Sequence, residues 1–205
     1  MAKAHEHDDS FSKNRMESLT DGIFATVMTI LILSLIVPII TGSDISGQLT
    51  SAIFSLFPSI VIYIFSFTVL LVMWIGHNNI FRYMHAVNPK LLWINGLFLL
   101  FIGIVPLSTA LLGRYPLQQA TIFFYAINFL ILAVIFKLFY RYTKKSHATD
   151  SVLARTYRSS WLSFALYIGA IIFSFVNPYL SLLLFSLLPI FYFYQAFFGM
   201  YRELN

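Results

Sequence analysis

Asp21 is an ionisable residue at the start of a long apolar segment. The segment runs from Gly22 to Pro38 without another charge, and Arg15 precedes Asp21 by six residues. A charged group at the edge of a membrane-spanning helix is costly unless it is paired or hydrated, so such a residue marks a candidate functional site. Its carboxylate can fix a neighbouring helix, attract cations or exchange a proton.

The helix that follows Asp21 has one face of unusual composition. In order, this face carries Gly22, Thr26, Thr29, Leu33, Ile36 and Ile40. At 3.6 residues per turn, the first four of these fall within an arc of about 60°. The face is therefore small and hydroxylated in its first half and branched-aliphatic in its second half.

Two interpretations of this face are open. In the structural one, Gly22, Thr26 and Thr29 form a strip of small residues against which another membrane helix packs closely. In the functional one, the strip lines a narrow water path in which hydroxyls replace part of an ion's hydration shell, and Leu33 or Ile36 forms an apolar constriction. Both hold if the same helix packs around a symmetry axis.

Further polar residues are expected at the same membrane face as Asp21. Trp74 and His77 are three residues apart, which places them on one helix face, and Asn95 lies near the start of the next apolar segment. Taken singly, each is ordinary: a tryptophan at an interfacial belt, a histidine in a loop, an asparagine capping a helix. Arg, Trp and His are donors to a carboxylate. We therefore predict that Arg15, Asp21, Trp74, His77 and Asn95 form a network that holds the first helix at a fixed angle.

The composition predicts an all-α polytopic membrane protein. The 205 residues are 59% hydrophobic and 10% charged, with a mean hydropathy of +0.81. A soluble domain is nearer one quarter charged, so this chain cannot cover a surface that faces water. The net charge of +5 does not indicate nucleic-acid binding, because the basic residues flank apolar segments. The absence of cysteine excludes disulfide and thiolate chemistry.

Six segments reach the roughly 20 apolar residues that a spanning helix needs. They are residues 19–40, 52–76, 91–112, 119–140, 158–176 and 178–199. Of the 13 basic residues, all but Arg114 fall on one side of these spans. By the positive-inside rule this side is cytoplasmic, so both termini are expected in the cytoplasm.

We expect residues 1–17 to form a cytoplasmic tail, 18–201 the six-helix transmembrane domain, and 202–205 a short cytoplasmic end. The cluster from His5 to Asp9 has the side chains of a metal site, but short solvated tails rarely preorganise one, so a disordered tail is the expectation. No cleaved signal peptide is expected, because the first apolar segment is long enough to span. No cofactor is expected.

Three motifs carry a resemblance to a known family. The segment Arg15-Met-Glu-Ser-Leu-Thr-Asp21 resembles the first-helix signature R-x-x-x-F-S-D of the transmembrane protein 175 family, the lysosomal and endosomal potassium channels with prokaryotic relatives. Trp74-Ile-Gly-His77 and Trp93-Ile-Asn95 resemble its second-helix and third-helix motifs. The resemblance covers the first half of the chain well and the second half only as a hydropathy pattern.

The resemblance implies a potassium-selective channel without the TVGYG filter of ordinary potassium channels, and no such sequence occurs here. The first helices of the family line the pore, and a single six-helix unit resembles the prokaryotic form, a homotetramer. The residues that tie the pore helix to its neighbours correspond to Arg15, Thr20, Asp21, Trp74, His77 and Asn95. The implied partners are potassium ions, passing near Thr26 and Thr29, and the lipid of the plasma membrane.

The chain departs from the family pattern in two places. Leu19-Thr20 stands where the family has Phe-Ser, and Thr20 keeps the hydroxyl. Thr26 stands where the family usually has a bulky aliphatic residue at a constriction, whereas Thr29 and Leu33 follow the pattern. Leu33 is therefore the predicted position of the narrowest apolar ring.

Three other functions are open on the sequence. A proton-coupled secondary transporter would use Asp21 and His77 as a titrating pair, although the broken-helix repeats of such transporters are not evident. A non-conducting membrane scaffold would use the small-residue strip only for assembly. An intramembrane enzyme is least favoured, because no nucleophile–base pair or H-E-x-x-H spacing occurs in a span.

Overall fold

The computed structural model describes residues 13–36, 45–84, 87–144 and 151–203. Its helices are α1 (Lys13–Ile30), the 3₁₀ helix η1 (Leu31–Ser34), α2 (Ile45–Ser55), α3 (Phe57–Arg82), α4 (Pro89–Arg114), α5 (Gln119–Lys144), α6 (Ser151–Ser174) and α7 (Pro178–Glu203). Every regular element among these residues is helical, so the all-α prediction is confirmed.

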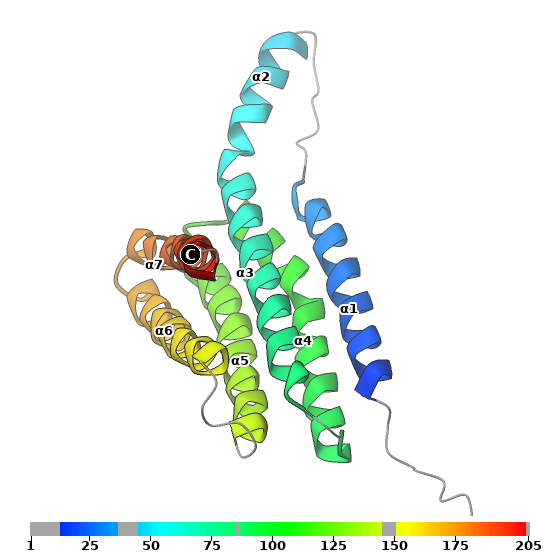
Figure 1. Ribbon diagram of the computed structural model, residues 1–205. Helices are drawn as coiled ribbons and strands as arrows, with labels where there is room; N and C mark the ends of the chain where they lie inside the picture. The colour runs from blue at the N-terminus through cyan, green and yellow to red at the C-terminus, as the bar shows by residue number, and fades with distance from the viewer. Residues whose placement is uncertain (1–12, 37–44, 85–86, 145–150, 204–205) are drawn as a thin grey trace, which may run out of the picture.

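Figure 1 shows how the helices are arranged. The α1 helix lies at one edge of the bundle and packs on α3 and α4, whereas α6 packs on α5, and α7 packs on α6 and α3 on the side away from α1. The start of α1, the end of α3, the start of α4 and the end of α5 lie together at one end of the bundle. This is the end that the basic residues predict to be cytoplasmic.

Four helical segments are long and apolar enough to cross a membrane: Lys13–Ser34, Gly47–Arg82, Pro89–Arg114 and Gln119–Arg141. They contain most of the first four predicted spans. The last two predicted spans correspond to α6 and α7, whose searched apolar parts are the shorter stretches Trp161–Ser174 and Pro178–Tyr192. The chain is therefore a multi-pass membrane protein.

The helices begin and end at different residues from those predicted. The α1 helix begins at Lys13, inside the predicted tail 1–17, where Lys13 pairs with Glu17 at 3.8 Å. The α3 helix continues to Arg82, six residues beyond the predicted span, so His77 lies in a helix and not in a loop. The α2 helix ends at Ser55 because of Pro58. A proline has no amide proton to donate, and its ring clashes with the backbone carbonyl four residues earlier.

The first helix changes its winding near its end. It is an α-helix to Ile30 and a 3₁₀ helix from Leu31 to Ser34. The Thr29 hydroxyl donates to the Thr26 carbonyl at 2.8 Å, which is the carbonyl that a regular α-helix would give to the amide of residue 30. Such back-bonding weakens and bends helices, and here it lies directly before the change of winding. Residues 37–40, the predicted end of this span with Ile40, lie outside the described residues.

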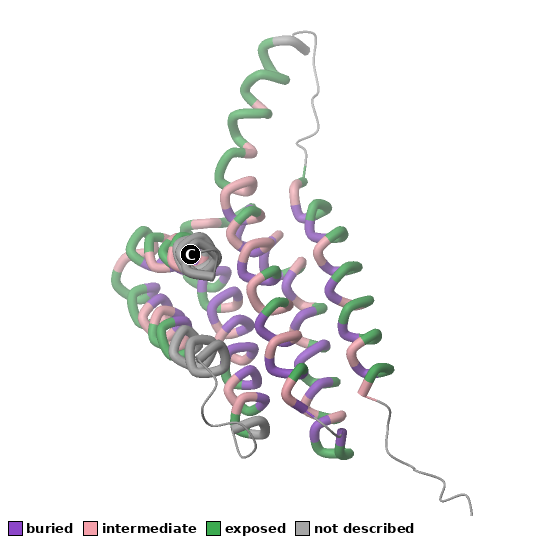
Figure 2. The backbone as a smooth tube through the Cα atoms, viewed as in Figure 1, coloured by how far each residue is buried: buried purple, intermediate pink, exposed green. Residues whose placement is uncertain are grey.

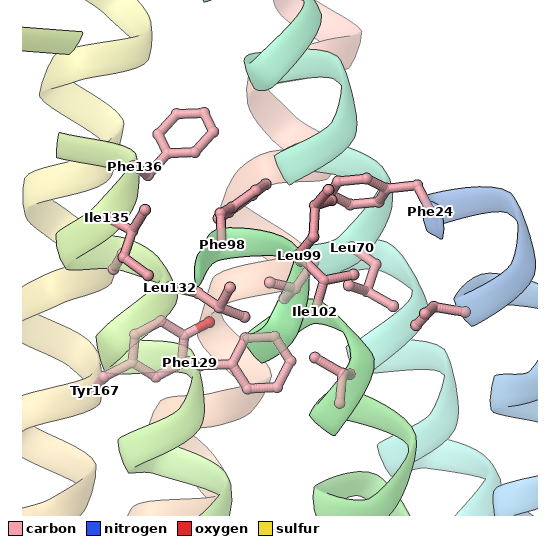
Figure 3. Packing of buried hydrophobic residues seen from close by; sticks show 14 of the residues in the cluster. Phe24, Leu70, Phe98, Leu99, Ile102, Phe129, Leu132, Ile135, Phe136 and Tyr167 are labelled. Carbon is pink, nitrogen blue, oxygen red and sulfur yellow. The ribbon is translucent and has the colours of Figure 1, made fainter. Parts of the chain in front are cut away.

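A layer of large side chains fills the centre of the bundle. Figure 3 shows Phe24 from α1, Leu70 from α3, Phe98 from α4 and Phe129 from α5 converging between the helices. Phe24 and Phe98 lie with ring centroids 5.9 Å apart. These contacts seat one side of α1 against the other helices.

The other end of the bundle is held by a close helix crossing. Ser59 of α3 donates to the carbonyl of Gly113 in α4 at 2.8 Å. A Cβ atom at Gly113 would lie 3.3 Å from the Cα of Ser59, so only glycine allows this approach without displacing the backbone. Small residues at helix contacts serve this purpose in membranes.

Substitution Gly113→Leu should lower the thermal unfolding temperature in detergent, because the side chain would force α3 and α4 apart. Overpacking of this kind costs about 1–3 kcal/mol. Gly103→Leu in the same helix is the matched control, since a Cβ at Gly103 meets nothing within 4 Å. Equal unfolding temperatures for the two variants would contradict the close crossing.

Candidate functional site

One face of the first helix is not covered by the other helices that the structure describes. Figure 2 shows an exposed edge along the whole length of α1. The exposed residues of this edge include Gly22, Thr26, Thr29, Leu33 and Ile36, with exposed fractions of 73% for Leu33 and 50% for Ile36. The opposite side, including Thr20, Phe24 and Val27, is buried. The predicted strip thus faces away from its own subunit.

The two threonines of the strip present acceptors outward. Thr26 donates its hydroxyl proton to the carbonyl of Gly22 at 2.8 Å, and Thr29 donates to the carbonyl of Thr26 at 2.8 Å. A hydroxyl has one proton and two lone pairs. Because the proton is used within the helix, each exposed oxygen has lone pairs for an external cation or a water molecule.

A buried chain of hydrogen bonds ties α1 to α4 and α3. Thr20 donates to the carbonyl of Met16 at 2.9 Å, Asn95 donates from Nδ2 to the Thr20 hydroxyl at 3.0 Å, and Asn95 Oδ1 lies 3.1 Å from His77 Nε2. The exposed fractions of Thr20, Asn95 and His77 are 0%, 1% and 0%. Polar contacts between helices stabilise membrane proteins in this way.

The direction of this chain follows from its first acceptor. A backbone carbonyl only accepts, so the single Thr20 proton goes to Met16, and the Thr20 oxygen must accept from the amide group of Asn95. The carbonyl oxygen of Asn95 then faces His77 and requires a proton on Nε2. The tautomer of His77 is thereby assigned from the network: in the neutral ring, Nε2 carries the proton and Nδ1 is bare.

Aromatic rings enclose His77 on three sides. Phe81 stacks on it with ring centroids 3.9 Å apart, Phe98 lies nearly parallel at 5.7 Å, and Phe139 meets it edge-on at 5.4 Å. No described group hydrogen-bonds to His77 Nδ1. The ring is a packed and oriented donor with no solvent contact.

Asp21 makes a second tie to α3 at the exposed end of the network. Trp74 Nε1 donates to Asp21 Oδ1 at 2.8 Å. Asp21 remains exposed, so its carboxylate keeps contact with water while one oxygen holds the indole. Charge-assisted bonds of this type are stronger than neutral ones.

The structure therefore brings together Thr20, Asp21, Trp74, His77 and Asn95 on three helices. Arg15 lies on the exposed side of α1, six residues before Asp21. The residues from His5 to Asp9, considered as a metal site, lie outside the described residues. Within the described part of the chain, no group of three His, Cys, Asp or Glu side chains could hold a metal ion.

The sequence analysis missed a second polar cluster inside the bundle. Thr109 donates to Ser66 at 2.8 Å, and Ser66 lies 3.0 Å from the hydroxyl of Tyr125, so the cluster joins α4, α3 and α5. All three side chains are buried. The available signal was the presence of hydroxyl residues in apolar spans, but their spacing in the chain does not reveal which of them meet.

Substitution Thr20→Val should lower the thermal unfolding temperature more than Thr68→Val. Both changes replace one hydroxyl by a methyl group, but only the first leaves a buried donor, Asn95 Nδ2, without its partner. An orphaned buried donor costs about 1–3 kcal/mol. Thr68 donates only to the carbonyl of Ile64 in its own helix, so its loss should be nearly neutral. Equal shifts would show that the Thr20–Asn95 bond does not hold α1.

Comparison with known proteins places this geometry in a family. A model of the family described as endosomal/lysosomal potassium channel TMEM175 matches residues 15–106. A potassium channel of Chamaesiphon minutus is 30% identical over 194 residues, covering 88% of this chain and 92% of that protein. A crystal structure from the same organism, titled a lysosomal potassium-selective channel TMEM175 homolog, aligns with a TM-score of 0.77 at 28% identity over 90% of this chain and 97% of that chain. The human endosomal/lysosomal proton channel TMEM175 is 27% identical over 152 residues, which is 70% of this chain and 30% of that protein. The chain belongs to the TMEM175 family.

Proposed function

We propose that this chain is a potassium-selective channel in which four subunits surround a central pore lined by α1. The observation that carries the proposal is the exposed strip that follows one line of α1 and η1 and is left uncovered by the other described helices of the subunit. Relatives that match almost the whole chain are named potassium channels, which supports potassium as the permeant ion.

Physical cost argues that the strip is covered in the assembled protein. Thr26 and Thr29 donate their protons within the helix, but their oxygens also have outward-facing lone pairs, which water and cations can satisfy and lipid tails cannot. Packing four copies of α1 around an axis would turn these oxygens toward water and ions. Closed rotational symmetry is the usual arrangement of soluble oligomers, and the same geometry gives a channel its axis.

The strip suggests how such a pore would select. Hydroxyl oxygens of Thr26 and Thr29 would replace part of the hydration shell of a potassium ion. Leu33, the most exposed aliphatic residue of the strip at 73%, would form an apolar ring, and Ile36 would continue it. Such rings gate by excluding water. A potassium ion releases its hydration shell more readily than sodium, so the ring would favour potassium.

The hydrogen-bond network would set the angle of the pore helix. Thr20 and Asp21 lie just before the strip, and each is tied to a different neighbouring helix. A small rotation of α1 would move Leu33 away from the axis. We therefore assign the network a positioning role and not a direct contact with the ion.

We further propose that the chain lies in the plasma membrane with both ends cytoplasmic. The support is the distribution of basic residues, since Arg82, Lys90 and Lys137 flank the same end of the bundle and Arg114 the other. Short basic segments stay on the cytoplasmic side.

The transporter alternative finds less support in the geometry. It needs Asp21 and His77 to exchange protons, but Asp21 bonds to Trp74 and His77 bonds to an amide. An amide does not carry a proton between titrating groups. The human relative is named a proton channel, so passive proton conduction is tested separately from coupled transport. The test is a current measurement across a planar bilayer with a pH gradient in place of the salt gradient.

Substitution Leu33→Ala should raise the single-channel conductance severalfold and shift the reversal potential under potassium–sodium conditions toward zero, because it removes the apolar ring. The measurement is current across a planar bilayer containing purified protein. Leu183→Ala is the matched control, because Leu183 is also exposed (55%) but lies in α7, on the far side of the bundle from α1. Unchanged currents in Leu33→Ala would sink the pore assignment. Saturable coupled flux in place of channel currents would favour the transporter.

Substitution Thr26→Val should lower potassium conductance while the oligomer and the unfolding temperature stay unchanged. Valine has the shape of threonine but offers no lone pair to an ion. Thr68→Val serves again as the control. If Thr26→Val conducts like the parent protein, then the Thr26 hydroxyl does not contact the ion, and Thr29 and Leu33 would account for selection.

A further inference from the structure

Lys137 is a cation within the apolar length of α5. Its Nζ lies 3.4 Å from the ring centroid of Trp161 and 3.7 Å from that of Phe164, both in α6. Ammonium groups this close to aromatic faces are held by the cation–π interaction. The two rings meet edge-on, with centroids 6.1 Å apart. This aromatic clamp fixes the position of the charge but contributes no negative charge to neutralise it.

The sequence supplies almost no acid near this cation. There is no Asp or Glu between Asp44 and Asp150, and none between Asp150 and Glu203. The helices α3, α4, α5 and α6 therefore contain no carboxylate at all. The Lys13–Glu17 ion pair lies in α1, away from this cation.

The surroundings of Lys137 are exposed on the outside of the bundle. Val134 and Leu138 on the same helix have exposed fractions of 42% and 36%, and Trp161 on α6 has 51%. Lys137 lies 18 residues after Gln119, at which α5 begins. At 1.5 Å per residue this is about 27 Å along the helix, close to the roughly 30 Å thickness of the hydrocarbon core. With Gln119 at one face of the membrane, this length puts the ammonium at the level of the lipid headgroups of the other face.

We propose that the clamp of Lys137, Trp161 and Phe164 is a binding site for the phosphate of an anionic phospholipid. A lipid phosphate is the one abundant anion at this depth, and its acyl chains would lie over Val134 and Leu138. Arg141, one helical turn further on and exposed, is placed to reach the same headgroup, because residues four apart share a helix face. Basic residues next to a membrane span attract anionic lipid.

The arrangement also explains the pairing of a lysine with aromatic rings. Tryptophan is enriched at the headgroup level of membranes. Holding the ammonium against two rings limits its motion before the lipid arrives, so less side-chain entropy is lost on binding. The site belongs to the outer surface of the bundle and is separate from the strip on α1.

Native mass spectrometry of the purified protein tests the proposal. The protein is mixed with equal amounts of phosphatidylglycerol and phosphatidylcholine that have the same acyl chains, and the retained lipids are counted. The parent protein should retain phosphatidylglycerol in preference, and Lys137→Gln should lose that preference severalfold. Arg114→Gln is the matched control, since it removes the same charge at the opposite end of the bundle, where Arg114 lies 5.7 Å from the ring of Tyr115.

Lys137→Arg is the control for misfolding. It keeps the cation and should therefore keep the preference for phosphatidylglycerol. Equal retention of phosphatidylglycerol by the parent and Lys137→Gln would overturn the proposal, as would loss in Lys137→Arg equal to that in Lys137→Gln. Displacement of the lipid by millimolar inorganic phosphate would also overturn it, because it would identify a site for free anions.

A second measurement needs no change at Lys137. Phosphatidylglycerol with brominated acyl chains should quench more of the tryptophan fluorescence than brominated phosphatidylcholine, and the extra quenching should disappear in Trp161→Phe. Equal quenching by the two lipids would count against the site.

Discussion

The structure depends on a hydrogen-bond chain that begins at the carbonyl of Met16 and ends on the ring of His77. Each link has one direction only, because a carbonyl accepts, a threonine has one proton, and an amide has a donor side and an acceptor side. Asn95 stands in the middle and is joined to α1 and α3 at once. In hydrocarbon no water can replace a lost partner, so the chain has one satisfied arrangement and the three helices have one register.

This constraint determines what the first helix can expose. Thr20 and Phe24 are buried at one turn's separation, so the opposite side of α1 must face away from the subunit. That side carries Thr26, Thr29 and Leu33. Because Thr20 is turned toward Asn95, these residues on the opposite side of α1 face the proposed pore. The hydroxyls of the strip bond back to their own helix, and this back-bonding accompanies the change to 3₁₀ winding at Leu31.

Much of this could be predicted from the sequence, and the remainder could not for physical reasons. Hydropathy located the spans, and helical periodicity located both the strip and the pair Trp74 and His77. Hydropathy placed the end of the second span too early. A histidine and two asparagines after Ile75 lower the hydropathy, but the helix continues to Arg82. It could not show that Asn95 bonds to Thr20, nor that Ser66, Thr109 and Tyr125 meet, because contacts between helices depend on rotation about each axis. The same limit hid the clamp on Lys137: a lysine near a span end indicates topology, and only the packing of α5 on α6 shows the two rings against it.

The α5 helix gives a physical link between the lipid-facing surface and the network. Phe136 and Phe139 face inward: a Cβ at Gly76 would come within 2.6 Å of Phe136, and Phe139 meets the rings of His77 and Phe98. Lys137 lies between these two phenylalanines in sequence and faces α6. One turn of α5 therefore carries both the cation that faces α6 and the rings that pack against His77. The absence of a side chain at Gly76 lets Phe136 fill the contact between α3 and α5. The proposed lipid would therefore bind to the same turn of α5 that packs against the His77 ring.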